Sequence, residues 1–113
     1  MESILESVKK MLGLDSEYEV FDTDIIIGIN SAFMTLMQLG VGPKEGFSIK
    51  DKEAIWSDFI GQRTDLEMVK QYVYLKTKLV FDPSLTSNIN EIYKEQIREL
   101  EWRLNVQVDP GGE

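Results

Sequence analysis

Apolar residues recur three and four positions apart along most of the chain, which is the spacing of one face of an α-helix. The first such stretch follows Ser3, which forms a capping-box pattern with Glu6, and it stops at Gly13. The second covers about 23–39 and ends at the glycines and the proline of 40–43. These two stretches predict a short first helix and a long second one.

Three isoleucines at 25–27 lie near the start of the second stretch and could, taken alone, belong to a strand. The helical spacing of the apolar residues that follow favours a helix instead. Asp22 or Thr23 is expected to cap this helix, and Asp24 in its first turn suits the positive end of the helix dipole.

The second half of the chain predicts three more helices. A short one over 54–60 should bury its aromatic side chains. A longer one over about 65–81 follows a capping-box pattern at 64–67, and because it is apolar on most sides we expect it to be the central, buried helix. Asp82 and Pro83 then break the chain. The last helix covers about 85–104, with an apolar stripe of Ile89, Ile92, Tyr93, Ile97, Leu100 and Leu104.

After the last helix, Val106 and Val108 alternate with polar residues over 105–109, which is typical of a β-strand, and the end of the chain over 110–113 is expected to be flexible. Phe47 and Ile49 alternate in the same way within a loop, so a short extended piece can form there. We therefore expect an all-α fold: a compact bundle of four to five helices forming one domain over 1–104, with an extended C-terminal tail over 105–113.

Composition limits the chemistry that the chain can perform. Its 113 residues, of which 42% are hydrophobic, suffice for one core. There is no apolar run near about twenty residues, so no membrane span is expected, and the amphipathic N-terminus does not resemble a signal peptide. The absence of cysteine and histidine excludes disulfides, cysteine nucleophiles and histidine bases.

The charge is strongly acidic, with a net value of −8 at pH 7. The segment 15–24 carries five acidic residues and no basic one, while the twelve Lys and Arg residues are scattered along the chain. Proteins that bind duplex DNA usually gather their basic residues on one face. The sequence therefore disfavours ordinary nucleic-acid binding and favours a solvated acidic surface.

One cluster of residues could belong to an enzyme: Glu91, Glu95, Glu99 and Glu101 in the last predicted helix. Carboxylates four positions apart can hold Mg²⁺, as in all-α nucleotide hydrolases, and Asp65 and Glu67 could add ligands from another helix. However, interleaved Lys and Arg residues favour an ion-paired, solvated face, with Glu95–Arg98 and Glu99–Arg103 as the expected pairs. We predict no catalytic residue, no cofactor and no metal site.

Two tryptophans and the chain end invite a structural interpretation. Trp56 is expected in the core, whereas Trp102 falls off the apolar stripe and is either a satellite core contact or an interface anchor. A lone strand after a helical domain has no sheet of its own and can pair with another molecule. The residues predicted for an assembly interface are Trp102, Val106, Val108, Phe47 and Ile49.

Seven segments, in this order along the chain, carry a pattern that is specific only as a set: FDTDIIIGIN (21–30), AFM (32–34), QLGVG (38–42), WSDF (56–59), YVYLK (72–76), FDP (81–83) and ELEWRLNVQV (99–108). With this set the chain resembles, over nearly its whole length, the small head–tail connector (adaptor) proteins of tailed phages and prophages.

The resemblance implies an all-helical structural subunit without catalytic residues. It implies self-association into a ring, with a dodecamer as the expected form, between the portal protein and the neck or tail proteins. DNA would pass non-specifically through the channel, and an acidic lining would repel it. The expected location is the head–tail junction of the virion, or the host cytoplasm during assembly. Two other classes compete: the carboxylate–metal hydrolase above, and a stand-alone acidic interaction or regulatory protein that mimics DNA.

Overall fold

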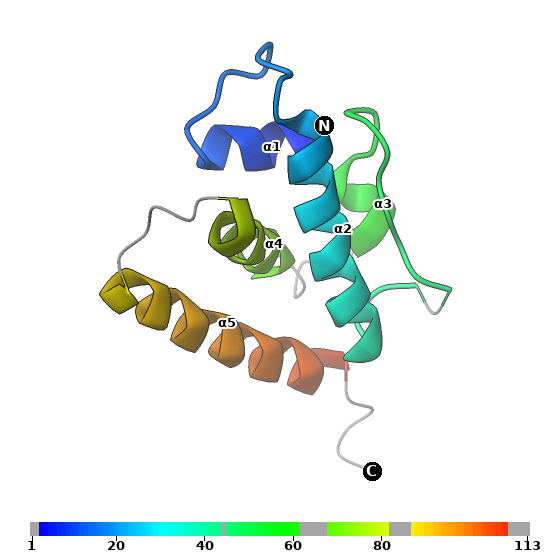
Figure 1. Cartoon of the computed structure of the whole chain (residues 1–113). Coiled ribbons are helices and arrows are strands. Elements are labelled where there is room, and N and C mark those ends of the chain that lie inside the picture. The colour runs from blue at the N-terminus through cyan, green and yellow to red at the C-terminus, as the bar shows by residue number, and fades with distance from the viewer. Residues whose placement is uncertain (1–2, 44, 62–67, 82–86, 109–113) are drawn as a thin grey trace.

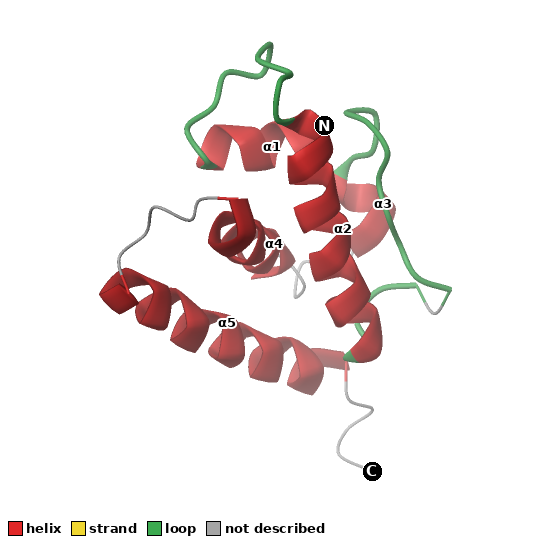
Figure 2. Cartoon of the chain, in the orientation of Figure 1, coloured by secondary structure: helices red, strands yellow, loops and turns green. Residues whose placement is uncertain are grey.

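The computed structural model describes residues 3–43, 45–61, 68–81 and 87–108. Within these residues the chain forms helices joined by loops and no strand, so the all-α prediction is confirmed (Figures 1 and 2). The helices are α1 (Ile4–Met11), α2 (Asp22–Gln38), α3 (Trp56–Ile60), α4 (Met68–Phe81) and α5 (Ser87–Val108).

Helix α4 is the central element, as its apolar sequence predicted. It packs against α2 on one side and α5 on another, and it also contacts α1 (Figure 1). Val69, Tyr72 and Val73 are fully buried in its first turns. Its end differs, because Val80 is 71% exposed. The apolar character of α4 therefore serves the core along most of the helix and the surface at its C-terminal end.

The close contact between α2 and α4 depends on a small residue. A Cβ atom placed on Gly28 of α2 would lie only 3.2 Å from the Cγ2 atom of Thr77 in α4. The absence of a side chain at Gly28 lets the two helices approach, and Ile25 and Ile29 on the same side of α2 are fully buried. This α2–α4 contact forms the centre of the core.

The start of the chain docks onto α3 through a few hydrogen bonds. The Ser3 hydroxyl accepts a bond from the Glu6 amide at 3.3 Å, so the predicted cap is confirmed. The Ile4 amide donates to the Ala54 carbonyl at 3.0 Å. Trp56 is 4% exposed, and its indole N–H donates to the Ser7 hydroxyl at 2.8 Å. The prediction that Trp56 belongs to the core is confirmed.

Helix α2 begins differently from the prediction. Its N-cap is Phe21, which makes no side-chain capping bond, so neither Asp22 nor Thr23 is the cap. The Asp22 carboxylate instead pairs with the ammonium of Lys9 at 2.8 Å. Lys9 is 1% exposed, and its ammonium also donates to the Ser16 carbonyl at 2.9 Å. The local capping preference of Asp22 gives way here to a contact that joins α1, the loop over 12–21 and α2.

Helix α5 uses only part of its predicted apolar stripe. Ile97, Leu100 and Leu104 are buried, whereas Ile89 and Ile92 are 39% and 55% exposed. Figure 1 shows the reason: α4 is seen nearly end-on while α5 runs across the view, so the two helices cross steeply. The first turns of α5 therefore extend past α4, and their apolar side chains reach solvent.

The predicted strand over 105–109 is wrong where the structure describes it, because α5 continues to Val108. The alternation of two valines is too short to distinguish a strand from a helix, and a helix already formed extends at the gain of one hydrogen bond per residue. The Asn105 side chain also donates to the Leu39 carbonyl at 3.1 Å, which fixes this turn against the end of α2. Residue 109 lies outside the described residues.

Several predicted features lie outside the described residues: the capping box at 64–67, the break at Asp82 and Pro83, and the chain end at 110–113. In the part of the chain that the structure describes, no helix is long and apolar enough to cross a membrane.

Candidate assembly surface

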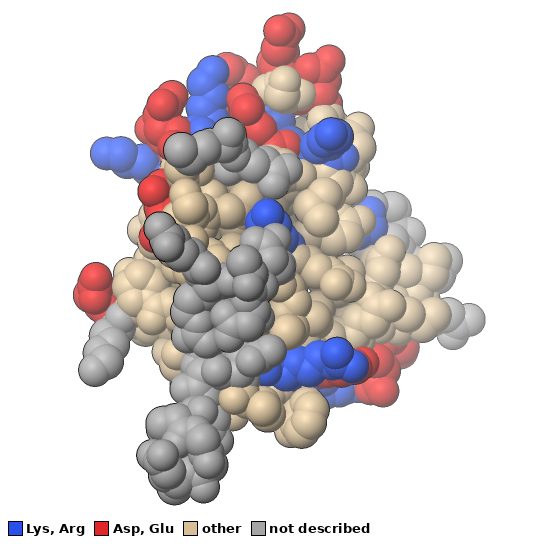
Figure 3. Space-filling model, turned by 180° about the vertical axis from the view of Figure 1, so that it is seen from behind, with Lys and Arg blue, Asp and Glu red and all other residues tan. Residues whose placement is uncertain are grey.

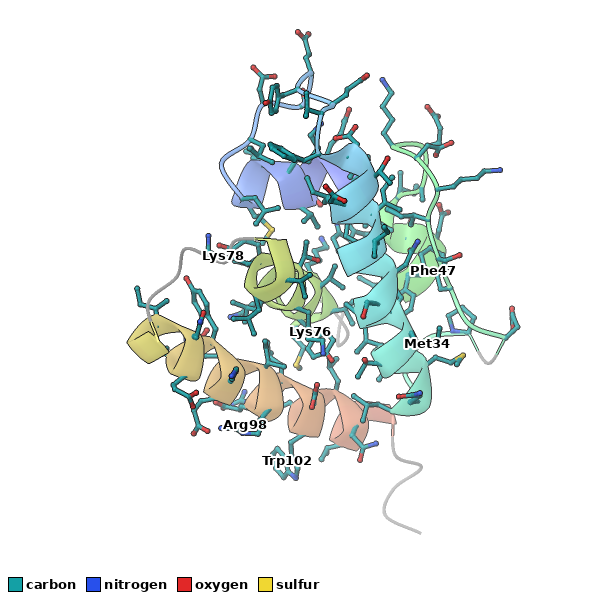
Figure 4. All side chains as sticks on the ribbon, in the orientation of Figure 1. Met34, Phe47, Lys76, Lys78, Arg98 and Trp102 are labelled. Carbon is teal, nitrogen blue, oxygen red and sulfur yellow. The ribbon has the colours of Figure 1, made fainter. Side chains whose placement is uncertain are left out.

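The outer face of α5 carries large apolar side chains that the fold leaves uncovered. Trp102 is 68% exposed and points away from the rest of the molecule, below α5 in Figure 4. Val106 follows one helical turn later on the same face and is 51% exposed. The exposure of Trp102 favours its role as an interface anchor over that of a satellite core contact. A shallow groove along this face is lined by Ile92, Glu95, Gln96, Arg98, Glu99 and Trp102.

Charged residues around this groove pair with one another along the helix. Arg98 forms an ion pair with Glu95, and Arg103 pairs with Glu99 at 2.7 Å, so both predicted pairs are confirmed. All four side chains are more than half exposed. Exposed pairs of this kind contribute little to stability, and their partners exchange readily.

The four glutamates that could have formed a metal site do not share one face. Glu91, Glu95 and Glu99 lie along the outside of α5 near their basic partners, whereas Glu101 turns toward α4 and accepts a hydrogen bond from Tyr72. Among the described residues, no group of three or more acidic side chains is arranged to hold a metal ion. Asp65 and Glu67, the other candidate ligands, lie outside the described residues.

Side-chain hydrogen bonds to α4 and to the end of α2 help to hold α5 against the rest of the fold. The Tyr72 hydroxyl of α4 donates to the Glu101 carboxylate at 2.8 Å, and Asn105 bonds to the last turn of α2. Burial raises the pKa of Tyr72 well above its usual value, and the negative charge of Glu101 raises it further. The buried phenol therefore stays protonated and keeps donating, which orients α5 with its outer face toward solvent.

The other predicted interface residues lie elsewhere. Phe47 is half-buried, with its ring 4.9 Å from the Phe33 ring, and Ile49 is 5% exposed. Both the amide and the carbonyl of Ile49 bond to the side chain of Asn30, at 2.7 and 2.9 Å. The structure thus places Phe47 and Ile49 at the core, away from Trp102 and Val106. The side chain of Val108 lies outside the described part of the molecule.

A second apolar surface was missed by sequence reasoning. Phe21, Asp24, Ile27 and Val80 line an open, mostly apolar pocket where α2 begins and α4 ends. Ile27 is 61% exposed while Ile25 is fully buried. The signal was present in the isoleucines at 25–27, because successive helix residues are about 100° apart and three in a row cannot all face one core.

The chain matches a known protein family along nearly its whole length. The model of the phage connector protein family matches residues 4–111. No curated protein and no solved structure matches the chain. Because the matched region runs from the first turn of α1 past the end of α5, nearly the whole sequence follows the family pattern, and the chain belongs to the phage connector protein family.

Proposed function

We propose that this protein is a structural subunit of the head–tail junction of a tailed phage or prophage particle. It joins a ring, with a dodecamer as the expected form, between the portal and the neck or tail proteins, and DNA passes through the ring. The observation that carries this proposal is the family match over residues 4–111. The family is a structural one, and in this role the chain uses surfaces, with no catalysis and no cofactor.

The outer face of α5 supports an assembly role for this surface. An exposed tryptophan beside an exposed valine would lose water-accessible apolar area in a complex, and tryptophan is enriched among the residues that dominate interface energies. The ion-paired Glu and Arg residues around them suit the polar rim of such an interface. The proposed assembly residues are therefore Trp102 and Val106, with Val108 as a further candidate.

Phe47 and Ile49 fit this proposal less well than the sequence alone suggested. Their side chains pack into the core, and the backbone of Ile49 is already bonded to Asn30. A neighbouring molecule could not pair with the backbone of Ile49 without breaking these bonds. We accordingly limit the proposed interface to α5 and its surroundings.

The acidic character of the molecule supports passive DNA passage. The net charge is −8, and Figure 3 shows acidic side chains, with basic ones among them, at the α1 end of the molecule. A ring that presents acidic side chains to its channel repels the phosphate backbone of DNA and does not bind any particular DNA sequence. The subunit would reside in the virion, or in the host cytoplasm before assembly.

The test is deletion of the gene in the parent phage or prophage, followed by complementation. We expect the deletion to give separate heads and tails in electron micrographs, and the wild-type gene to restore joined particles that contain the chain by mass spectrometry. Trp102→Ala should restore poorly, whereas Met34→Ala, which truncates another exposed side chain (56% exposed), serves as the matched control. Normal particles that lack the chain would refute the proposal.

A further inference from the structure

We infer that subunits contact one another head to tail, with the indole of Trp102 from one copy seated in the pocket of Phe21, Ile27 and Val80 on the next. This inference rests on the proposed function, because it assigns the contact between neighbouring subunits of the ring. It depends on three observations: an open pocket whose described lining is mostly apolar, an exposed tryptophan on another face, and the places of both in the fold.

The pocket has the chemistry of a tryptophan site. Its walls are an aromatic ring and two branched aliphatic side chains, and Phe21, Ile27 and Val80 are 37%, 61% and 71% exposed. Among the described residues of its lining, Asp24 is the polar one. An indole presents a large apolar surface with a single N–H donor, so it matches apolar walls that carry one carboxylate acceptor.

The surroundings of the two features differ in charge: the pocket side is acidic, whereas on the outer face of α5 the side chains of Lys94, Arg98 and Arg103 pair with Glu91, Glu95 and Glu99. The segment 15–24 beside the pocket holds five acids and no base. Trp102 is flanked by Arg98 and Arg103 on α5, and both guanidinium groups are more than half exposed. Their present glutamate partners are equally exposed, and such pairs are weak enough to be exchanged for carboxylates of a neighbour. On contact, the exposed guanidinium groups of Arg98 and Arg103 would form ion pairs with acidic side chains of segment 15–24 on another copy.

The fold prevents Trp102 from reaching the pocket of its own chain. The pocket lies where α2 begins and α4 ends, close to α1, whereas α5 lies on the other side of α4 from α1 and turns Trp102 outward (Figures 1 and 4). A contact between two different surfaces of identical subunits is heterologous. Repeated, it gives a closed ring or an open filament, in contrast to a two-fold dimer.

The absence of cysteine from the chain makes cross-linking a clean test. Thr23→Cys places a thiol one turn before Ile27, and Val106→Cys places one a turn after Trp102; both positions are exposed. A mixture of the two folded single-cysteine proteins, treated with a short bismaleimide, should give a covalent heterodimer. Each variant alone should give little dimer, and Lys50→Cys, exposed on the 45–53 loop, should replace Thr23→Cys poorly as the matched control.

The Trp102 side chain and the apolar wall of the pocket are then altered in separate variants. Trp102→Ala in the Val106→Cys protein, or Ile27→Asp in the Thr23→Cys protein, should each lower the heterodimer yield by about tenfold, the factor expected for loss of about 1.4 kcal/mol. Both side chains are exposed, so circular dichroism should show both variants folded. A Val106→Cys homodimer of equal yield would overturn the inference in favour of two-fold α5 pairing.

The same thiols distinguish this inference from the proposed function. In purified particles, Val106→Cys should cross-link to Thr23→Cys of another copy. If the chain is present at the junction but Val106→Cys cross-links to a different particle protein, the function stands and the head-to-tail contact is wrong. If the heterodimer forms in solution but the chain is absent from particles, the contact stands and the proposed function is wrong.

Discussion

Thr77 is fully buried between α4 and α2, and within the described part of the chain its hydroxyl has no hydrogen-bond partner. Valine has nearly the same shape without the hydroxyl. We expect Thr77→Val to raise the free energy of unfolding by about 1 kcal/mol, because an unsatisfied buried polar group is removed. Urea unfolding measures this change.

Two further substitutions at Thr77 separate the hydroxyl from the packing. Thr77→Ala also removes the methyl group that contacts Gly28, so it should lower stability despite losing the same hydroxyl. Thr77→Ser keeps the hydroxyl without the methyl group and should be the least stable of the three. A Val variant less stable than wild type would show that the hydroxyl is hydrogen-bonded.

Tyr72 makes stability depend on alkaline pH. Its pKa is raised above the ordinary value of about 10, first by burial and then by Glu101. A raised pKa contributes stability that is fully present below about pH 10 and is lost as the pH rises further, because the unfolded chain then releases a proton that the folded chain retains. We expect chemical denaturation to show a steep loss of stability above this pH that is absent from Tyr72→Phe.

At neutral pH, Tyr72→Phe should lower stability by about 2 kcal/mol, since a hydrogen bond to a charged acceptor is lost. Tyr18→Phe is the control, because Tyr18 is 46% exposed and its replacement should leave the alkaline loss unchanged. Equal slopes above pH 10 in wild type and Tyr72→Phe would contradict the assignment.

Some contacts between neighbours in sequence were predictable, and contacts that depend on helix crossing were not. The Ser3 cap follows from a four-residue pattern and is present. The Tyr72–Glu101 bond joins residues 29 positions apart, and no local pattern reports how α4 and α5 cross. The sequence predicted that Gly42 helps to end α2. It did not show that a Cβ atom at this position would lie 2.4 Å from the Phe59 ring.

At the scale of elements, Lys9 joins α1 to the loop over 12–21 and to α2. It is buried, and its ammonium is bonded to both the Asp22 carboxylate and the Ser16 carbonyl. Lys9→Met should lower stability by about 3 kcal/mol, because it leaves the Asp22 carboxylate without its partner. Hydrogen exchange of the amides at 13–21 should rise in this variant.

A double-mutant cycle tests this role of Lys9. Asp22→Asn alone leaves a buried ammonium unpaired, so it should also be destabilising, whereas Lys9→Met with Asp22→Asn removes both charges and should recover part of the loss. Single-variant effects that simply add would show that the pair is not coupled.

Element types were predictable because long apolar repeats have one period, but element ends were not. The pattern over 105–109 offered only two apolar positions, and tertiary contacts decided the outcome in favour of helix. The apolar stripe of α5 correctly predicted that Ile97, Leu100 and Leu104 lie on the buried face of the helix. It could not show that Ile89 and Ile92 lie beyond the edge of α4. The site was partly predictable for the same reason: Trp102 was visible as a residue off the stripe, while the pocket required two helices to be placed together.

The charge of the whole molecule is uneven. Residues 11–43 contain no basic residue, whereas α4 contains three lysines and no acid. Identical subunits with a net charge of −8 repel one another at long range, so attraction is limited to apolar contacts and individual ion pairs formed at close range. Association of the isolated protein should therefore be weak and should need a template such as the portal to complete a ring.

We therefore expect the purified protein to sediment as a monomer or as a weak, heterogeneous oligomer. The Debye length falls from about 30 Å at 0.01 M salt to about 8 Å at 0.15 M, so added salt screens the long-range repulsion before it weakens pairs in contact. Average mass should rise over this range, and Trp102→Ala should abolish the rise, because the apolar contact supplies the attraction that remains under screening. A tight dimer at low concentration, unchanged by salt, would contradict both the repulsion and the head-to-tail geometry, since a two-fold contact closes after two subunits.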